Sequence, residues 1–514
     1  MLSAYAIVLT PTILLSGGTI YDGSGSKPYI GDVRIQGNKI IAVGKLKAAP
    51  GESVFQLKGL AVSPGFIDAH SHADRGIDED PLAVSQLTQG ITTAVVGQDG
   101  GWRKPVREAF KDLAAYRPAI NFAIFSGHGG VRDAILKDDY KRNATPAEAF
   151  AMQKLVIDDM KAGALGLSTG LEYDPGYYSD TNEVILLAKG VAPYKGIYIS
   201  HVRDEGDKAF ESFEELIRIS KEAGIHGQIS HIKLCSAAVW GRSGKANQVG
   251  LKQGITADVY PYTFWQSTMS ALSASRDWAN REIWVKALSD VGGAQNVRLT
   301  RYTHEPNWVG KTLAEIAKLT NRDAISIIQE ILDKTNGPNG TGSQSVAVTA
   351  MQESDLEAFI ASPRTMFCSD GSIGGTHPRG AGSFPRILGR YVRDRKVITL
   401  QEAIRKMTSF AAETLQIKNR GRLRPGWMAD LVVFDPKTIQ DHATTANPTA
   451  LSTGVKYVWV SGVKVLAQGK ATGLRSGKMV RRDQPDLAVQ EESSAELVAT
   501  SKHTHPESLC CGEQ

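Results

Sequence analysis

Short apolar runs that end in polar residues alternate with amphipathic stretches between residues 64 and 410. Each run has the length of a buried strand, and the stretches between runs have the 3.6-residue spacing of helices. Eight strands that alternate with helices predict an α/β fold, a closed (β/α)8 TIM barrel. The eight runs are 65–72, 92–99, 121–128, 164–172, 196–203, 226–233, 255–262 and 365–370. The main expected helices are 80–89, 146–162, 181–188, 207–223 and 400–408.

Both ends of the chain show a different pattern. Residues 12–63 contain short alternating runs separated by Gly-rich turns, which is typical of antiparallel strands. A similar pattern returns after the barrel, so we expect residues 12–63 and 420–475 to form one small composite β-sandwich domain, with the barrel at 64–419. The long gap between runs seven and eight predicts an inserted subdomain at about 270–364, and the polar stretch 478–514 predicts a disordered tail.

Composition narrows the class of protein. The 514 residues are 42% hydrophobic and 22% charged, with a net charge of +5, which is ordinary for a globular protein and argues against nucleic-acid binding. Four cysteines do not make a disulfide framework. The apolar stretch 4–15 is short for a membrane span, and no basic residue precedes it. We therefore expect a cytoplasmic protein, or a periplasmic one if this stretch is a truncated export signal; the sequence leaves the oligomeric state open.

Four histidines lie at or near the ends of the predicted strands. His70 and His72 are two residues apart, a spacing that places both imidazoles on one side of an extended chain, where they can chelate a cation. His201 and His231 end runs five and six. A single histidine at such a place is more often a buried hydrogen-bonded residue, but four on one barrel rim indicate a metal site.

Two carboxylates complete this set. Asp370 ends run eight and can accept a proton from water and pass it to a leaving group, although an Asp before Gly is also typical of a helix cap. A pair of metal ions needs a shared anionic ligand. Run four has no lysine for this role, because Lys161 lies in the preceding helix, and it ends in Glu172. We therefore predict Glu172 as the ligand from run four, with a solvent-facing turn residue as the alternative.

With these residues in place, the chain resembles the amidohydrolase superfamily and, more narrowly, the N-acyl-D-amino-acid deacylases, or D-aminoacylases. The resemblance covers about residues 16–470. Its most specific segments are 64–74, 163–176 (GALGLSTGLEYDPG), 200–207 (SHVRDEGD), 229–233 (ISHIK), 258–262 (DVYPY) and 377–392 (HPRGAGSFPRILGRYV).

This resemblance implies zinc, as one or two ions or replaced by another divalent metal, and hydrolysis of the amide of a small N-acylated D-amino acid. By motif match the metal ligands are His70, His72, His201 and His231, and Asp370 is the catalytic acid and base. Arg379 in the HPR segment is expected to bind the substrate carboxylate. Lys233 and Tyr260 match positions that line the substrate pocket.

The chain departs from the family pattern at one position. Many members have a cysteine ligand after the second strand, in a segment like Gly-Asn-Cys-Gly, and here the segment is Gly97-Gln98-Asp99-Gly100. Zinc accepts carboxylate oxygen, but with different geometry. Asp99 is therefore a metal ligand, a residue that hydrogen-bonds to a metal ligand, or a turn residue. We favour Glu172 over Asp99 as the shared ligand.

Other functions fit the same residues. A dipeptidase for D-residues or an isoaspartyl dipeptidase would retain the free carboxylate for Arg379. A cyclic-amide hydrolase is disfavoured by the HPR segment and by the missing lysine of run four. A non-catalytic scaffold barrel would typically have lost the histidines that this chain retains.

Overall fold

The centre of the molecule is a ring of parallel strands. The computed structural model describes residues 12–482 except 102–103, 250–253, 274–276 and 338. Strands β6, β7 and β8 pair in one group, and β9, β10, β11, β12, β13 and β17 pair in another. The groups meet where β8 continues into β9 and where Ala69 N donates to Phe367 O at 3.4 Å, which closes the ring. The strands are β6 (Phe66–Asp68), β7 (Ile91–Val96), β8 (Asn121–Ile124), β9 (Ser126–Gly127), β10 (Gly166–Gly170), β11 (Ile197–His201), β12 (His226–Ile229), β13 (Thr256–Val259) and β17 (Thr365–Phe367).

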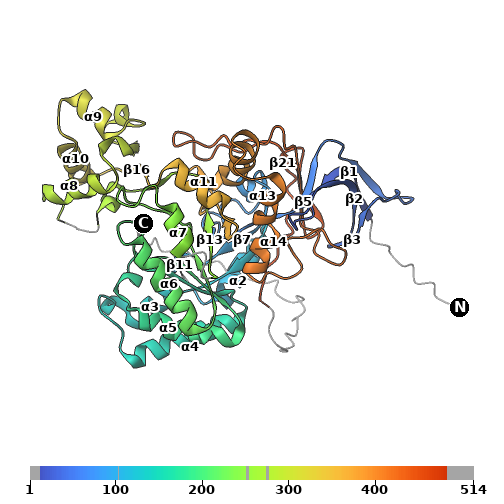
Figure 1. Cartoon of the computed structure of the whole chain (residues 1–514), viewed down its shortest axis with the longest axis horizontal. Helices are drawn as coiled ribbons and strands as arrows, with labels where there is room; N and C mark the ends of the chain where they lie inside the picture. Colours follow the sequence, from blue (N-terminus) through green and yellow to red (C-terminus); the bar gives the residue numbers. More distant parts are fainter. Residues whose placement is uncertain (1–11, 102–103, 250–253, 274–276, 338, 483–514) are drawn as a thin grey trace, which may run out of the picture.

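Helices cover the outside of this barrel, and their apolar faces pack on the strands (Figure 1). Helix α4 shows how the sequence sets their ends. Thr145 and Glu148 form a reciprocal capping box at its start, and Gly163, with φ 104°, ends it. The covering helices are α1 (Val84–Leu87), α2 (Val106–Ala115), α3 (His128–Leu136), α4 (Pro146–Ala162), α5 (Thr181–Val191), α6 (Ala209–Ala223), α7 (Ser243–Val249), α11 (Glu353–Ala361), α12 (Arg379–Arg386), α13 (Leu400–Met407) and α14 (Ser409–Thr414).

Helix α1 is much shorter than the expected helix 80–89. Asp80 accepts hydrogen bonds from Leu82 N and Val84 N, and Ala83 takes a positive φ of 49°, so the chain is turned before the helix begins. The apolar spacing alone did not show this local turn.

Strands from both ends of the chain form one nine-stranded sheet at the side of the barrel. Its order is β21-β20-β19-β18-β5-β1-β2-β3, with β4 paired to β1, and the antiparallel pair β5–β18 joins the two ends. Leu15, Val33, Leu431 and Trp459 are buried together in its core. The strands are β1 (Thr12–Ile20), β2 (Tyr29–Gln36), β3 (Lys39–Gly44), β4 (Ser53–Gln56), β5 (Ala61–Pro64), β18 (Leu431–Phe434), β19 (Val455–Val460), β20 (Val463–Ala467) and β21 (Lys470–Ala471).

The segment between β13 and α11 forms a subdomain with its own apolar core, at the opposite end of the molecule from β1–β3 (Figure 1). Its antiparallel sheet has the order β14-β16-β15. In the pair of β14 and β16, Phe264 lies opposite Thr349. The segment therefore starts before the expected residue 270, because β14 belongs to its sheet. It ends before the expected residue 364, because α11 packs against α7 and β17 of the barrel. Its elements are β14 (Phe264–Ser267), α8 (Arg281–Asp290), β15 (Val297–Tyr302), α9 (Leu313–Thr320), α10 (Ala324–Asn336) and β16 (Gln344–Thr349).

The last described residues run along β8. Phe122 N donates to Lys478 O at 3.0 Å, and Val480 N donates to Phe122 O at 2.7 Å. Residues 478–482 thus belong to the folded barrel, contrary to the tail expected from 478, because their backbone groups find partners on a strand that lies far away in the sequence. The rest of that expected tail, 483–514, lies outside the described residues, as does most of the apolar stretch 4–15.

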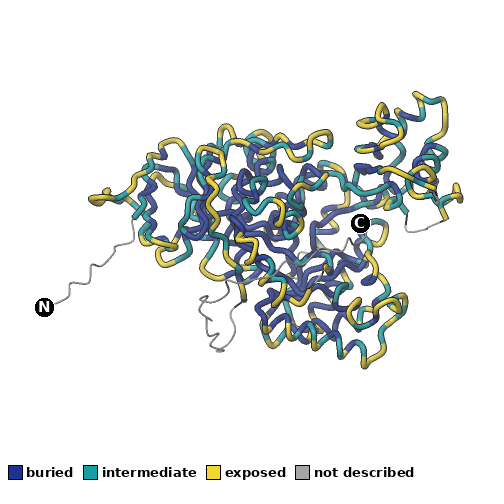
Figure 2. Tube along the Cα trace, turned by 180° about the vertical axis from the view of Figure 1, so that it is seen from behind, coloured by how far each residue is buried: buried dark blue, intermediate teal, exposed yellow. Residues whose placement is uncertain are grey.

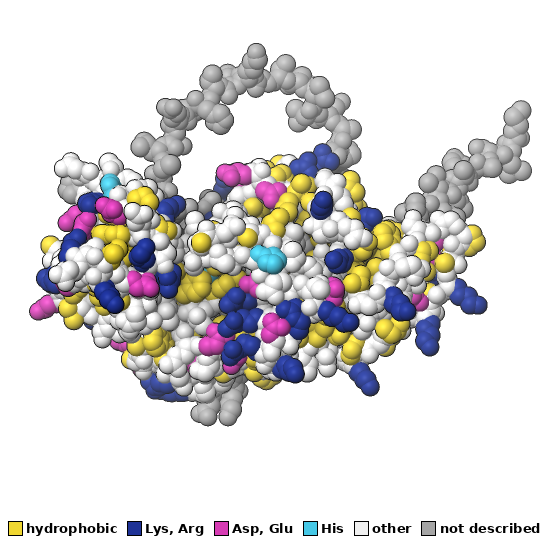
Figure 3. Space-filling model, turned by 90° about the horizontal axis from the view of Figure 1, so that it is seen from above, with side chains coloured by type: hydrophobic (Ala, Val, Ile, Leu, Met, Phe, Trp, Pro, Cys, Tyr) yellow, Lys and Arg dark blue, Asp and Glu magenta, His cyan; other side chains and the backbone are white. Residues whose placement is uncertain are grey.

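Burial and charge follow the expected pattern of a globular protein. Buried residues are concentrated in the barrel and along the sheet that joins it (Figure 2). On the face shown in Figure 3, basic and acidic side chains are interspersed among apolar groups. None of the helices in the described part of the chain combines the length and the apolar character that a bilayer crossing needs.

Candidate metal centre and substrate site

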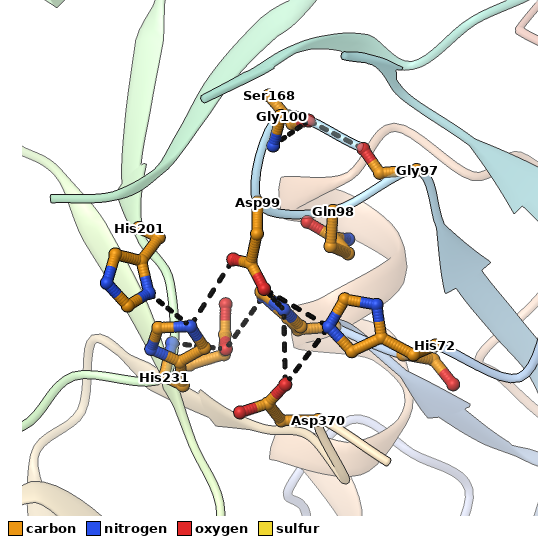
Figure 4. Close-up of polar contacts among 12 residues, drawn as sticks. His72, Gly97, Gln98, Asp99, Gly100, Ser168, His201, His231 and Asp370 are labelled. Carbon is orange, nitrogen blue, oxygen red and sulfur yellow. Dashed lines mark hydrogen bonds and ion pairs between the residues drawn. The ribbon is translucent and has the colours of Figure 1, made fainter. Parts of the chain in front are cut away.

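The predicted rim residues meet in one buried cluster (Figure 4). His70 and His72 follow β6, Asp99 follows β7, and Asp370 follows β17. His201 is the last residue of β11, and His231 lies two residues beyond β12. All of these positions are at the carboxyl ends of the strands, the face on which barrel enzymes place their chemistry.

Two carboxylates face the first pair of histidines. His72 Nε2 lies 3.1 Å from Asp99 Oδ2 and 3.2 Å from Asp370 Oδ1. His70 Nε2 lies 3.3 Å and 3.6 Å from the same two oxygens. The four groups therefore surround a common point.

Asp99 also reaches the second pair. Its Oδ1 lies 3.3 Å from His231 Nε2, which in turn lies 3.1 Å from His201 Nδ1. One oxygen of Asp99 thus faces the histidines of β6 and the other faces a histidine from the opposite side of the cluster. A carboxylate placed in this way could be shared between two cations.

The turn that carries Asp99 is held by its neighbours. Asp99 has φ 55°, a left-handed conformation that Asp tolerates better than most residues. Ser168 Oγ donates to Gly97 O at 2.5 Å and accepts from Gly100 N at 3.2 Å, so a residue of β10 fixes both sides of the turn. The orientation of Asp99 is therefore decided by a strand about 70 residues away in the sequence.

Glu172 lies at the edge of the cluster. Its Oε2 is 2.8 Å from His201 Nε2, and its side chain is 45% exposed. Among the described contacts its carboxylate meets His201 and none of the other histidines of the cluster. The geometry therefore favours Asp99, and not the Glu172 that we favoured from the sequence, as the shared ligand.

The protein holds the cluster as buried anions beside imidazoles. Burial alone would raise the pKa of Asp370, but Arg379 and His231 hold it well below the usual range. Burial would lower the pKa of His72, yet hydrogen bonds to Asp370 and Asp99 raise it to about 9. Without a metal His72 thus compensates the two carboxylates by binding a proton, and a cation would displace that proton.

The donor set suits a divalent ion. One donor atom each from His70, Asp99, His231 and Asp370 lies within 4.8 Å of the others, and imidazole nitrogen with carboxylate oxygen is a typical zinc environment. The buried atom Asp99 Oδ1 has no hydrogen-bond partner in the described structure, although His231 Nε2 lies 3.3 Å away. Buried polar atoms are rarely left in this state, so the cluster fits a site that a cation completes.

Two cationic side chains, Arg379 and Lys233, adjoin the cluster. Arg379 Nη1 lies 2.6 Å from Asp370 Oδ2, and its guanidinium lies 4.8 Å from the ring centroid of Tyr260. The ammonium of Lys233 lies 5.4 Å from the same centroid. Arg379 Nε and Tyr260 Oη are buried without a hydrogen-bond partner in the described structure. The three predicted substrate residues are thus together, with free donors that an anionic group could use.

Three site residues were missed by sequence reasoning. Asp258 Oδ1 accepts from His231 N at 2.8 Å, and Tyr173 Oη lies 3.2 Å from His201 Nδ1. Glu205 Oε1 lies 3.1 Å from His231 Nδ1. All three occur inside the segments that carried the family resemblance, but only their contacts distinguish them from neighbouring polar residues.

A (β/α)8 barrel with imidazoles and carboxylates at its carboxyl rim defines a class of metal-dependent hydrolases. The sequence profile of the amidohydrolase family matches residues 285–466. The N-acyl-D-glutamate deacylase of Alcaligenes xylosoxydans xylosoxydans is 33% identical over 502 residues, which cover 92% of this chain and 96% of that protein.

Two solved structures are also similar to this chain. A crystal structure of D-aminoacylase has a TM-score of 0.79 at 30% identity and covers 91% of this chain and 99% of its own. The N-acyl-D-glutamate deacylase of Bordetella bronchiseptica, solved with zinc and a phosphonate inhibitor, has a TM-score of 0.78 at 31% identity with the same coverage. The chain belongs to the amidohydrolase family, in the group of the D-aminoacylases. The fold class and the family expected from the sequence are thereby confirmed.

Proposed function

We propose that this protein hydrolyses the amide bond of N-acyl-D-amino acids, releasing a carboxylic acid and a free D-amino acid. One observation carries the proposal: Asp370 contacts the histidine cluster with Oδ1 and Arg379 with Oδ2. A metal site and a carboxylate-binding site therefore share one carboxylate. An N-acylated amino acid has its scissile amide and its α-carboxylate separated by a single carbon, so both groups would lie close to Asp370.

We assign the metal ligands to the residues that converge on Asp99. His70 and His72 would hold an ion on the Oδ2 side of Asp99, and His201 and His231 on the Oδ1 side. Bound zinc would supply Lewis acidity, polarising the scissile carbonyl and lowering the pKa of a water molecule. The Bordetella relative was solved with zinc, which supports zinc as the ion.

Asp370 is proposed as the proton carrier. Its Oδ1 faces the cluster where water would be activated, so it accepts the water proton as the new C–O bond forms. When the C–N bond breaks, the same carboxyl group donates that proton to the departing amine. Asp370 therefore both accepts and returns the proton that the hydrolysis requires.

Arg379 is proposed to bind the α-carboxylate of the substrate. A guanidinium presents two parallel N–H donors to a carboxylate, and its planar face rests on Tyr260. With the amide at the metal and the carboxylate at Arg379, the third substituent of the α-carbon has a fixed direction. This three-point arrangement supports discrimination between D and L substrates.

The test is a substrate panel with the zinc-loaded protein and its Asp370→Asn variant. N-acetyl-D-amino acids, N-acetyl-L-amino acids and dipeptides with D or L C-terminal residues would be compared by release of free amine. Release confined to D substrates and lost in the variant supports the proposal. Release confined to dipeptides would indicate the dipeptidase alternative, and no release from any substrate would overturn the proposal.

A further inference from the structure

Glu205 is a buried carboxylate whose role the proposed mechanism does not use. It lies in the loop after β11, and its side chain is 8% exposed. Its Oε1 lies 3.1 Å from His231 Nδ1 and 3.1 Å from Lys233 Nζ, both in the segment that follows β12. Cys235 Sγ donates to its Oε2 at 3.6 Å. One carboxylate thus connects a proposed metal ligand with a proposed substrate residue.

We propose that Glu205 is a positioning residue that fixes the tautomer of His231 for metal binding and holds Lys233 beside Tyr260, where the substrate is proposed to bind. The part that concerns Lys233 rests on the proposed function. The part that concerns His231 depends only on the metal centre.

The two nitrogens of His231 face different groups. Nε2 points to the cluster, at 3.3 Å from Asp99 Oδ1 and 3.1 Å from His201 Nδ1. Nδ1 points away from it, towards Glu205 and Lys233. An imidazole binds a metal through a nitrogen that carries a lone pair, so its other nitrogen must carry the proton. Binding through Nε2 therefore requires an acceptor at Nδ1.

Glu205 and Lys233 favour opposite tautomers of His231. Lys233 Nζ lies 2.7 Å from Nδ1, and an ammonium can only donate, so on its own it would leave the proton on Nε2 and block metal binding. Glu205 can only accept when ionised, and it faces both groups from 3.1 Å. Its negative charge attracts the Lys233 donors and the Nδ1 proton together. The carboxylate is therefore what makes Nε2 available as a ligand.

A second metal site at Glu205 is disfavoured by the same contacts. His201, Glu205 and His231 offer donor atoms within 4.8 Å of one another. The Lys233 ammonium, however, is already within 3.1 Å of Glu205 and 2.7 Å of His231 Nδ1. A divalent cation there would meet a buried like charge, which is costly in a low-dielectric interior. Glu205 thus acts through His231 and Lys233.

The experiment compares zinc affinity and substrate kinetics in three variants of the full chain. Zinc binding to metal-free protein would be measured by competition with a chelator, which needs no substrate. Glu205→Gln replaces the ionised acceptor with a neutral amide of the same shape. Lys233→Met removes the cation and leaves Glu205. Glu214→Gln, an exposed position on α6, is the matched control for loss of one carboxylate.

We expect Glu205→Gln to bind zinc about 10- to 100-fold more weakly, the usual effect of removing the partner of a metal-bound imidazole. Its KM should also rise, because Lys233 loses its partner. Lys233→Met should raise KM without weakening zinc binding, because Lys233 favours the tautomer of His231 that does not bind metal, and Glu214→Gln should change neither quantity. Zinc affinity of folded Glu205→Gln within twofold of the wild type would overturn the proposal, as would an equal loss in Lys233→Met.

If Glu205→Gln does not fold, Glu205→Asp would take its place. It retains the charge but withdraws the carboxylate by one methylene, so weaker zinc binding is expected and an unchanged affinity would overturn the proposal. If no N-acyl-D-amino acid is hydrolysed, KM cannot be compared and the part of the proposal that concerns Lys233 fails with the proposed function. The zinc affinities still test the part that concerns His231. The failure of the proposed function is therefore distinguishable from the failure of this inference.

Discussion

Arg379 Nη1 lies 2.6 Å from Asp370 Oδ2, so the proposed carboxylate-binding group is paired with the proposed proton carrier before substrate arrives. The α-carboxylate of a substrate would compete with Asp370 for the same guanidinium. Binding of substrate would then weaken the contact that keeps the pKa of Asp370 low, and a carboxylate with a higher pKa accepts a proton more readily. Substrate recognition and proton transfer are thus connected through one ion pair.

Replacing Asp370 with Asn should separate catalysis from metal binding. The amide cannot accept and return the proton, so we expect kcat to fall by about 10²- to 10⁴-fold. Zinc content should remain near that of the wild type, because the histidines and Asp99 remain. Metal analysis alongside steady-state kinetics checks both parts, and a kcat near the wild-type value would exclude Asp370 as the proton carrier.

Replacing Arg379 with Met should affect substrates that carry a free carboxylate. Loss of a charge-assisted bidentate contact costs about 2 kcal/mol, so kcat/KM for an N-acetyl-D-amino acid should fall by about 30-fold. The matched control is the same compound with its carboxylate converted to a methylamide, on which wild type and variant should be similar. An equal fall in kcat/KM on both compounds would show that Arg379 supports the structure of the site and does not bind the substrate carboxylate.

Two carboxylate variants distinguish Asp99 from Glu172. Asp99→Asn keeps a residue that tolerates a positive φ but removes a shared anionic ligand, so zinc affinity should fall by at least about 10-fold. Glu172→Gln should lower zinc affinity far less, because Glu172 is half exposed, so water can replace its contact with the one histidine that it meets in the described cluster. The reverse order of effects, measured by equilibrium metal binding, would restore Glu172 as the shared ligand.

Acid stability should depend in part on an ion pair in the terminal sheet. Arg34 Nε and Nη2 donate to the two carboxylate oxygens of Glu52 at 2.7 Å and 2.9 Å, and these bonds lower the pKa of Glu52 to about 2. An unfolded Glu has a pKa of about 4.3. The folded pKa is therefore the lower one, so the stabilisation is complete above the unfolded pKa and is lost as the pH falls towards 2.

The measurement for this pair is the unfolding midpoint of the wild type and of Glu52→Gln across pH. The two midpoints should differ at neutral pH, by an amount equivalent to about 1 kcal/mol, and should converge between about pH 4 and pH 2. A difference that persists unchanged at pH 2 would mean that the ionised form of Glu52 is not what stabilises the sheet.

The apolar periodicity of the sequence predicted helices well where the residues that define a helix lie within or next to that helix. The helices expected at 146–162 and 207–223 are close to α4 and α6, because each buries apolar residues along its length and ends at a Gly in the left-handed conformation. The expected helix 80–89 is mostly a turn, because Asp80 and Ala83 set local conformations that the apolar spacing does not record. The limits of the inserted segment were displaced because the pairing of β14 with β16 joins residues some 80 positions apart.

The sequence by itself determined the barrel, the family and the identity of the rim histidines. Strand and helix periods are local, and the spacing of His70 and His72 fixes their common side. Only the tertiary structure showed that Asp99, and not Glu172, faces histidines of both pairs, and it placed Glu205 between His231 and Lys233. Each carboxylate follows a strand in much the same way, and its direction depends on backbone turns and partners from distant strands. That information exists only once the barrel has closed.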